Sequence, residues 1–340
     1  MIHLKAIRFI LLVLTWLLLA RPLGAQPVDQ ANEIEALRSE VARLRQQVDN
    51  LPFVVQQLRK ANTDTQFQLA AASNFNYSKV AYKSKVDGFD VPAYVFTPLV
   101  KAGKRRHPAL LWIHGGVHGD LDSYYARFMK PFLAKGYVII APEYRGSTGY
   151  GRRHYEAIDY GGKEVDDCLT AVDYLIENVD MVDPQRIGLI GWSHGGFIAL
   201  HSIFREPEKF ACSVDVVGVT DLITRLAYKS DSYRRIFSAQ PGIGGTVEER
   251  RDIYLERSPL YHVEKLRTPL LIHAADNDDD VHIIENERLI EELKQAGKQF
   301  EYKIYHNPPG GHSFNRVESP QSRDSWKLIT EFLERHLARR

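Results

Sequence analysis

The chain has 340 residues, 44% of them hydrophobic, which excludes a disordered or fibrous protein and permits a large buried core. Its 44 lysine and arginine residues balance 43 acidic residues, so that the net charge is +1. Without an excess of basic residues, we expect no nucleic-acid binding.

The N-terminus has the pattern of a secretory leader. Lys5 and Arg8 precede an apolar run from Phe9 to Ala20, and this run is shorter than the roughly 20 residues that span a bilayer. We predict a signal peptide over residues 1–25, cleaved after Ala25; the alternative is an uncleaved membrane anchor. Cleavage implies a secreted or periplasmic protein with no stable membrane span and a net charge of about −2.

Residues 26–62 are predicted to form a helical, coiled-coil-like segment. Its apolar positions alternate by three and four residues, with a β-branched residue first and leucine fourth in each heptad: Ile34, Leu37, Val41, Leu44, Val48, Leu51, Val55 and Leu58. This choice favours a parallel dimer, and Glu33 with Arg38 and Glu40 with Arg45 stand where charges pair between the two helices. We therefore expect a homodimer through residues 32–58, with a kink or restart at Pro52. The alternative is an amphipathic helix lying on its own domain.

Residues 76–340 are predicted to form one α/β domain after a polar stretch over 62–76. Two strands, 77–86 and 89–96, meet at Asp87-Gly88, which is a hairpin signal. Further strands are expected at 109–114, 137–141, 186–190, 212–217, 270–274 and 300–305, and helices at 123–134, 163–177, 197–205, 283–296 and 325–337. This alternation predicts a mainly parallel sheet covered by helices on both faces. Cys168 and Cys212 are expected to be buried free thiols.

The segment Gly191-Trp192-Ser193-His194-Gly195-Gly196 follows the apolar run at 186–190 and has the G-x-S-x-G pattern of a nucleophile elbow. A strand that turns at once into a helix needs small residues two positions before and after the serine, and Gly191 and Gly195 meet this need. The His194 N–H would open the helix, where its dipole favours an oxyanion.

A serine nucleophile needs a base and an orienting acid, which in this fold follow two later strands. Four aspartates follow the strand at 270–274, namely Asp276, Asp278, Asp279 and Asp280, and His312 follows the strand at 300–305. The residues alone leave the choice of aspartate open. A calcium loop over Asp276 to Glu287 is an alternative, although Val281 stands where such a loop needs glycine.

Several motifs in this order resemble the catalytic α/β-hydrolase domain of the prolyl oligopeptidase family of serine peptidases, nearest its acylaminoacyl-peptidase branch. The resemblance runs from about Val80 to the C-terminus and rests on His114-Gly115-Gly116, Tyr144 to Gly151, Asp183 to Ile187, Gly191 to Gly196, Asp278 with Val281, and Gly311-His312. It implies that Ser193 is the nucleophile, Asp278 the acid and His312 the base. It also implies an oxyanion hole from the His194 and Gly116 N–H groups, without metal or cofactor.

Other features concern the surroundings of this site. The family usually carries a β-propeller, and the residues between the leader and the first hydrolase strand are too few and too helical to form one. Substrate selection is then expected from the segment 223–261, which carries Tyr228, Tyr233, Phe237, Tyr254 and Tyr261. The alternative for this segment is a packed two-helix insertion. We expect the His194 side chain to line the pocket, His114 to structure the oxyanion loop and His118 to be solvated.

The patterns predict a serine hydrolase that works through an acyl-enzyme, and the resemblance implies that it cleaves peptide or acyl-amino-acid bonds. One alternative is a carboxylic ester hydrolase with the same triad. The other is an inactive coiled-coil scaffold that only binds, although the intact serine, acid and histidine argue against it.

Overall fold

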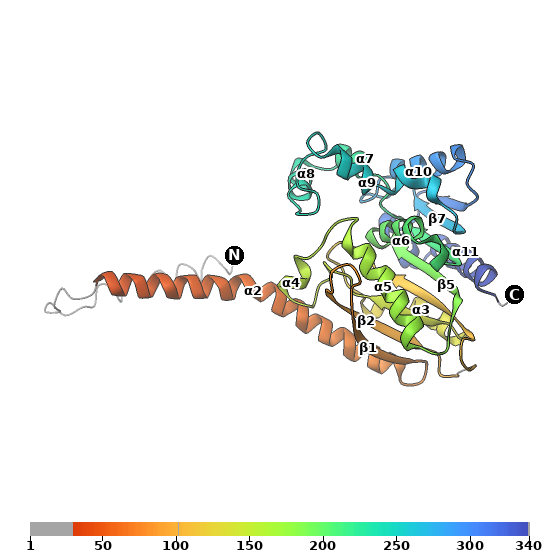
Figure 1. Ribbon diagram of the computed structural model, residues 1–340, viewed down its shortest axis with the longest axis horizontal. Coiled ribbons are helices and arrows are strands. Elements are labelled where there is room, and N and C mark those ends of the chain that lie inside the picture. Colours follow the sequence, from red (N-terminus) through yellow and green to blue (C-terminus); the bar gives the residue numbers. More distant parts are fainter. Residues whose placement is uncertain (1–29, 101, 339–340) are drawn as a thin grey trace. The chain divides into compact units, whose positions relative to one another are not determined.

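The computed structural model describes residues 30–100 and 102–338 (Figure 1). The predicted signal peptide over residues 1–25 lies outside the described residues. In the described ranges, no helix is both long enough and apolar enough to cross a membrane. The chain divides between Leu51 and Pro52 into two compact units, each described by itself below.

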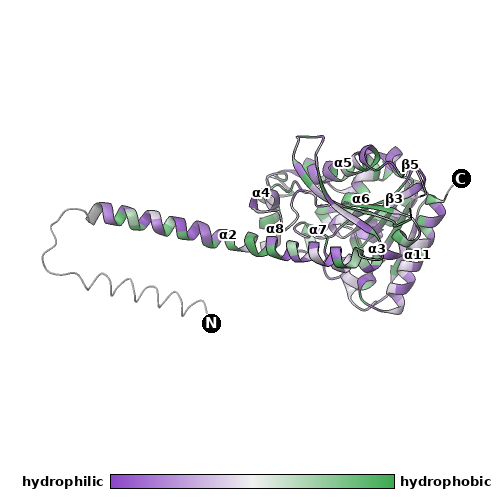
Figure 2. Ribbon diagram, turned by 90° about the horizontal axis from the view of Figure 1, so that it is seen from below, coloured by the Kyte–Doolittle hydropathy of each residue, from purple (hydrophilic) through white to green (hydrophobic). Residues whose placement is uncertain are grey.

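The first described helix, α2 (Gln30–Ala71), begins in the first unit. Over residues 34–51 its apolar side chains are exposed, with exposed fractions from 45% for Val41 to 62% for Val48. Apolar and polar residues alternate along this part of the helix (Figure 2). Arg43 donates to Glu40 of its own helix, with 2.6 Å between Nη2 and Oε1. The heptad residues 34–51 thus form an apolar stripe that faces solvent.

The helix extends beyond the segment 26–62 predicted for it, because α2 continues through the polar residues after 62 to Ala71, and Pro52 lies inside the helix without ending it. Phe67 is fully buried and packs its ring 5.3 Å from those of Tyr94 and Phe96. Lys60 is also buried on this helix. Tertiary packing, rather than local composition, therefore extends the helix.

One eight-stranded sheet forms the centre of the second unit. In sheet order its strands are β1 (Asn76–Lys83), β2 (Asp90–Thr97), β4 (Val138–Pro142), β3 (His107–Ile113), β5 (Val182–Trp192), β6 (Cys212–Val216), β7 (Leu270–Ala275) and β8 (Glu301–Tyr305). The predicted hairpin is the antiparallel pair β1–β2, and β2 pairs antiparallel with β4. All pairs from β4 to β8 are parallel, which confirms the predicted mainly parallel sheet.

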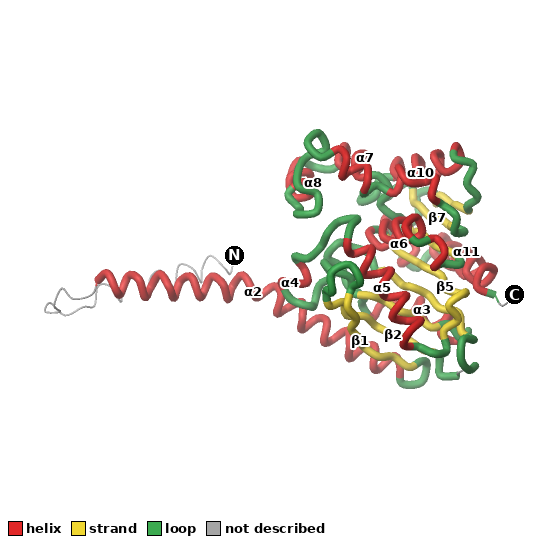
Figure 3. Tube along the Cα trace, in the orientation of Figure 1, coloured by secondary structure: helices red, strands yellow, loops and turns green. Residues whose placement is uncertain are grey.

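Helices cover both faces of this sheet (Figure 3). They are α3 (Ala126–Ala134), α5 (Lys163–Asn178), α6 (His194–Arg205), α10 (Ile283–Gln295) and α11 (Pro320–Leu337), whereas α4 (Arg152–Tyr155) is a short turn in the loop after β4. Alternate strand residues point to opposite faces, so that Leu111 joins the core beneath α5 and α6 while Leu110 joins the core beneath α3 and α11. Cys168 and Cys212 are buried free thiols, as predicted.

The segment between β6 and β7 contains three α-helices rather than the two considered from the sequence: α7 (Leu222–Tyr228), α8 (Asp231–Ser238) and α9 (Arg251–Glu256). Ser230 caps α8 by accepting from the Tyr233 N–H at 3.3 Å, and so separates α7 from α8. We call residues 222–261 the cap.

Candidate active site

Ser193 sits at the sharp turn between β5 and α6. Its backbone is in a strained region, with φ 54° and ψ −117°. A Cβ on Gly191 would lie 2.1 Å from the Gly195 carbonyl oxygen, and one on Gly195 would lie 2.4 Å from that of Ile113. Both glycines are therefore needed for close backbone approach, and the turn has the geometry of a nucleophile elbow.

Asp278 and His312 meet at the carboxyl edge of the sheet. The loop after β7 carries Asp278, and the short helix η4 (Gly311–Arg316) after β8 carries His312. His312 Nδ1 lies 2.7 Å from Asp278 Oδ2, and the other carboxylate oxygen accepts from the N–H groups of Asp280 and Val281. Asp278 is therefore a buried acceptor held in one orientation, which suits an acid that orients an imidazole.

The structure does not bring all three sequence-predicted residues into contact. Within the described part of the chain, no hydrogen bond joins the Ser193 hydroxyl to His312. Instead, Asp280 Oδ2 lies 3.6 Å from His312 Nε2, the nitrogen that a serine hydroxyl would use.

Asp280 belongs to a charged cluster that sequence reasoning missed. Arg225 of the cap is buried and donates to the Asp280 carboxylate at 3.0 Å, and Lys229 donates to the same oxygen at 2.6 Å. Burial opposes the charge on Asp280, but Arg225, Lys229 and His312 outweigh it and hold its pKa below the ordinary value. We call the loop after β7, residues 276–282, the acid loop. The cap is thus tied to the acid loop beside His312.

His114 is held within the loop that follows β3, which we expect to be the oxyanion loop. Its ring is buried and stacks on Tyr144, with 4.4 Å between ring centroids. Nδ1 lies 3.1 Å from the Gly115 carbonyl oxygen and Nε2 lies 3.0 Å from Ser147 Oγ. A Cβ on Gly115 would lie 3.4 Å from Ser193 Cβ, so that this loop passes directly beside the nucleophile.

The expectation for His118 is wrong. Its side chain is half-buried, stacks on Tyr155 with centroids 3.6 Å apart, and has Nδ1 2.8 Å from the Gly146 carbonyl oxygen. The loop after β4 covers it, which a lone histidine in a glycine-rich loop does not reveal. His194 is buried against Tyr160 and Glu164; its N–H begins α6, next to Ser193.

Asp215 is a second buried acid that sequence reasoning missed. It lies in β6, and a Cβ on Gly196 or Gly218 would lie 2.1 Å from its Oδ1. Burial raises the pKa of this carboxyl to about 8. The sequence signal that could have found it is an aspartate inside an otherwise apolar strand. With this raised pKa, Asp215 is a neutral acid beneath α6 at neutral pH.

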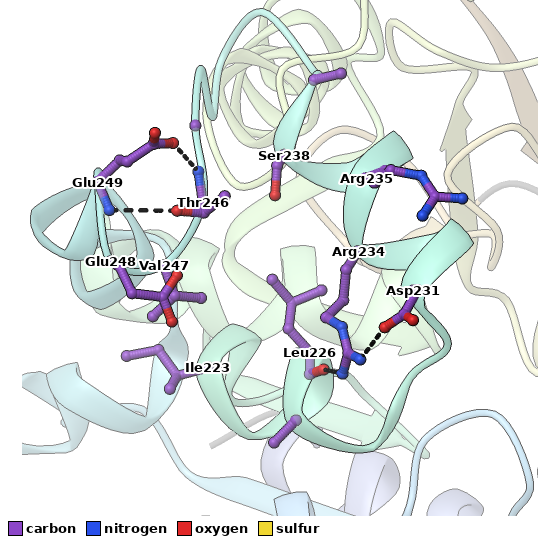
Figure 4. Close-up of a pocket in the computed structure, with 13 residues that line it drawn as sticks. Ile223, Leu226, Asp231, Arg234, Arg235, Ser238, Thr246, Val247, Glu248 and Glu249 are labelled. Carbon is purple, nitrogen blue, oxygen red and sulfur yellow. Dashed lines mark hydrogen bonds and ion pairs between the residues drawn. The ribbon is translucent and has the colours of Figure 1, made fainter.

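A cavity of about 920 Å³ lies in the cap. Ile223, Leu226 and Val247 form its apolar wall, and the Arg234–Asp231 ion pair lies at its edge (Figure 4). Ser193, Asp278 and His312 do not line it. Ile223 and Leu226 face this cavity from α7, while Arg225 of α7 contacts Asp280 beside His312. The helix α7 therefore separates the cavity from His312.

The aspartates of the acid loop have different partners. Asp276 lies 2.9 Å from His306 Nδ1, Asp278 contacts His312, and Asp280 contacts Arg225. Among the described residues, no group of three or more acidic, histidine or cysteine side chains is placed to hold a metal ion. This dispersal argues against the calcium-loop alternative.

Curated relatives of the chain are peptidases. It is 31% identical over 254 residues to the "Uncharacterized peptidase YuxL" of Bacillus subtilis, covering 74% of this chain and 38% of that protein. It is 29% identical to the "Acylamino-acid-releasing enzyme" of Arabidopsis thaliana, covering 66% of this chain and 30% of that protein. The chain therefore spans only about a third of the length of these relatives.

Solved structures show the same fold. A puromycin-hydrolyzing peptidase of Mycobacterium tuberculosis matches with a TM-score of 0.70 and 25% identity, covering 78% of this chain and 40% of that one. The acylaminoacyl peptidase of Pyrococcus horikoshii also matches with a TM-score of 0.70, at 23% identity, covering 81% of this chain and 44% of that one. These matches confirm the α/β-hydrolase fold.

A model of the prolyl oligopeptidase family matches residues 124–340, which contain the elbow, the acid loop and the histidine loop. The chain belongs to the prolyl oligopeptidase family of serine peptidases.

Proposed function

We propose that the chain is a serine peptidase that cleaves peptide or acyl-amino-acid bonds through Ser193, Asp278 and His312. The observation that carries this proposal is the 2.7 Å contact between Asp278 and His312 at the sheet edge where the strained Ser193 turn also lies. Family membership supports the serine-peptidase chemistry, and the 31% identical relative is itself called a peptidase.

In this mechanism the Ser193 oxygen attacks the substrate carbonyl carbon while its proton passes to His312 Nε2. The carbonyl oxygen becomes an oxyanion that accepts from the His194 and Gly116 N–H groups. Collapse of this intermediate breaks the bond to the leaving amine, which takes the proton from His312 and leaves an acyl-serine. Water then attacks the acyl-serine and gives one proton to His312. Collapse of this second intermediate breaks the bond to the Ser193 oxygen, which takes that proton back from His312, and releases the acid.

The surroundings of His312 fit its role as a base that is charged for part of the cycle. Asp278 accepts from Nδ1, which leaves Nε2 as the nitrogen that accepts the serine proton. The carboxylate stabilises the imidazolium that forms during attack. Asp280, 3.6 Å from Nε2, places a second carboxylate beside the ring and adds to this stabilisation.

We assign acyl-group selection to the cap, which is packed against the elbow through aromatic residues. Tyr160 lies 4.6 Å from His194 and 4.8 Å from Phe237 between ring centroids, and all three are buried. This buried aromatic cluster packs the cap against the elbow helix and so positions the cap beside the site.

The proposal also has an assembly part and a location part. The exposed apolar stripe at residues 34–51 supports a parallel homodimer through residues 32–58. The leader, outside the described residues, supports a secreted or periplasmic location.

Labelling with a serine-directed fluorophosphonate, alongside assays of a peptidyl p-nitroanilide and a short acyl p-nitrophenyl ester, tests the activity. We expect labelling of Ser193 and turnover of the amide. Turnover of the ester without the amide would favour the esterase alternative. A protein that neither reacts nor hydrolyses either substrate would favour the scaffold alternative.

A further inference from the structure

Lys60 of α2 is a charged side chain that is buried within the second unit. Lys60 is 2% exposed, and its Nζ donates to the Leu121 carbonyl at 2.6 Å, to Asp120 at 3.0 Å and to the Glu143 carboxylate. Glu143 has no exposed surface. A lysine buried against carboxylates is rare, because removing the charges from water costs free energy that only a well-fixed geometry recovers. The buried Lys60–Glu143 ion pair therefore suggests a role beyond stability.

Glu143 links Lys60 to the oxyanion loop. Its Oε1 accepts from Lys60, and its Oε2 lies 3.5 Å from His114 Nε2. Burial opposes ionisation of Glu143, but Lys60 and His114 outweigh it and keep its pKa below the ordinary value. Glu143 is therefore an anion that faces the lysine on one side and the histidine on the other.

His114 in turn fixes one peptide plane. The Gly115 carbonyl, 3.1 Å from His114 Nδ1, shares a planar trans peptide with the Gly116 N–H. In such a peptide the carbonyl oxygen and the N–H point in opposite directions. A histidine that holds the Gly115 oxygen therefore also sets the direction of the Gly116 N–H.

The next peptide is held from the same side. Tyr144 stacks on His114 and donates its hydroxyl to the Gly116 carbonyl oxygen at 2.8 Å. The glycine-rich loop that follows Tyr144 packs on the lysine itself, since a Cβ on Gly149 would lie 2.7 Å from Lys60 Cβ. The oxyanion loop, this glycine-rich loop and α2 thus form one interlocked layer.

From this chain of contacts we propose that Lys60 is a positioning residue, which aims the Gly116 N–H at the oxyanion through Glu143, His114 and the Gly115 carbonyl. This inference rests on the proposed function, because it presumes that the Gly116 N–H stabilises the oxyanion. It gives α2 a role in catalysis without contact with substrate.

The test measures kcat and KM for a peptidyl p-nitroanilide, and inhibition by a peptidyl trifluoromethyl ketone, which forms an oxyanion when serine adds to it. Lys60→Met keeps the aliphatic stem against Gly149 and removes the charge. We expect kcat to fall about 10- to 100-fold, part of the 10²- to 10³-fold effect of losing an oxyanion donor. KM should stay within about twofold, and the inhibition constant of the ketone should rise in parallel with the loss of kcat.

Two further variants separate aiming from stability. Lys60→Met combined with Glu143→Gln leaves no unpaired buried charge, so the fold should persist while kcat stays low. Lys79→Met is the matched control, because it also removes one lysine charge. Lys79 lies on β1 and forms a partly exposed ion pair with Asp64, which is on the same helix as Lys60. It should leave kcat, KM and thermal stability unchanged.

Several outcomes would overturn the inference. These are a kcat within twofold of the parent in Lys60→Met, recovery of parental kcat in the double variant, or a double variant that is unfolded at the assay temperature. If Ser193→Ala also keeps parental activity, the proposed function fails with it. If Ser193→Ala is inactive, only the aiming role of Lys60 is lost.

Discussion

The helix residues 34–51 and the unit that begins at Pro52 differ in how far their apolar side chains are buried. In the second unit, large apolar side chains such as Trp112, Trp192 and Phe197 are fully buried by their own chain. In residues 34–51 every heptad position is about half exposed. The comparison teaches that the proposed chemistry draws on residues of a single chain, whereas the exposed stripe is the surface through which we propose that two chains associate. Variants should therefore separate activity from assembly.

The largest effect is expected at the nucleophile. Ser193→Ala should lower turnover of a peptidyl amide on the order of 10⁶-fold, because no other group in the site attacks the carbonyl. Its mass in solution should equal that of the parent. Activity within tenfold of the parent would refute the assignment of Ser193.

The acid loop offers an internal control for the second prediction. Asp278→Asn should lower kcat about 10⁴-fold, because an asparagine amide favours the wrong tautomer of His312. Asp279→Asn changes the same charge one residue away on an exposed side chain and should have little effect. Equal losses in steady-state assays of the two variants would mean that another aspartate is the acid.

Asp215 predicts the pH dependence of stability in the second unit. Burial raises its pKa from 3.8 to about 8, so the folded state keeps a proton that the unfolded state releases. Stability should therefore be highest below about pH 4 for this group and fall as pH rises towards 8. The size is on the order of 5 kcal/mol, from about 1.4 kcal/mol per unit of pKa.

Asp215→Asn removes the titrating group, and urea unfolding at several pH values measures its effect. The stability difference between variant and parent should grow in favour of the variant from pH 4 to 8. Asp279→Asn serves again as the exposed control. Identical pH dependence in parent and Asp215→Asn would show that the carboxyl titrates normally.

The smallest effect on activity is expected from the helix. Leu37→Glu with Leu44→Glu would place charges in the proposed dimer seam and should release monomers whose activity stays within about twofold of the parent. Ala36→Glu with Ala42→Glu adds the same charge off the seam and should leave the dimer intact. Light scattering at micromolar concentration measures the outcome. A parent that is already monomeric would contradict the dimer.

The order of strands and helices could be read from the sequence because parallel strands buried on both faces form continuous apolar runs. The end of α2 could not be read in this way. Residues 62–71 are mostly polar, and their helix depends on Phe67 packing against the first two strands. Likewise, Ser230 caps the N-terminus of α8 and separates it from α7, so that the segment 222–261 contains more helices than the spacing of its aromatic residues suggested.

For the site, the elbow could be located from sequence because its glycines answer a local steric demand. The choice of Asp278 among its neighbours needed either a resemblance or coordinates, since adjacent aspartates are chemically alike. Lys60, Glu143 and Arg225 could not be found, because the ion pairs Lys60–Glu143 and Arg225–Asp280 join residues that lie 83 and 55 positions apart in the sequence. No local pattern distinguishes a buried lysine on a polar helix from a solvated one.

The two edges of the sheet acquire importance if two chains are held together. A dimer raises the effective concentration of each edge strand for its twin to the millimolar range. Unpaired backbone groups on β1 and β8 would then favour strand exchange and aggregation. Lys79 and Lys83 on β1, and Lys303 on β8, are all at least a third exposed. Charged side chains on edge strands, here ion-paired with Asp64, Asp90 and Asp324, keep those edges hydrated and oppose pairing, so the chain can bring its copies close without joining their sheets.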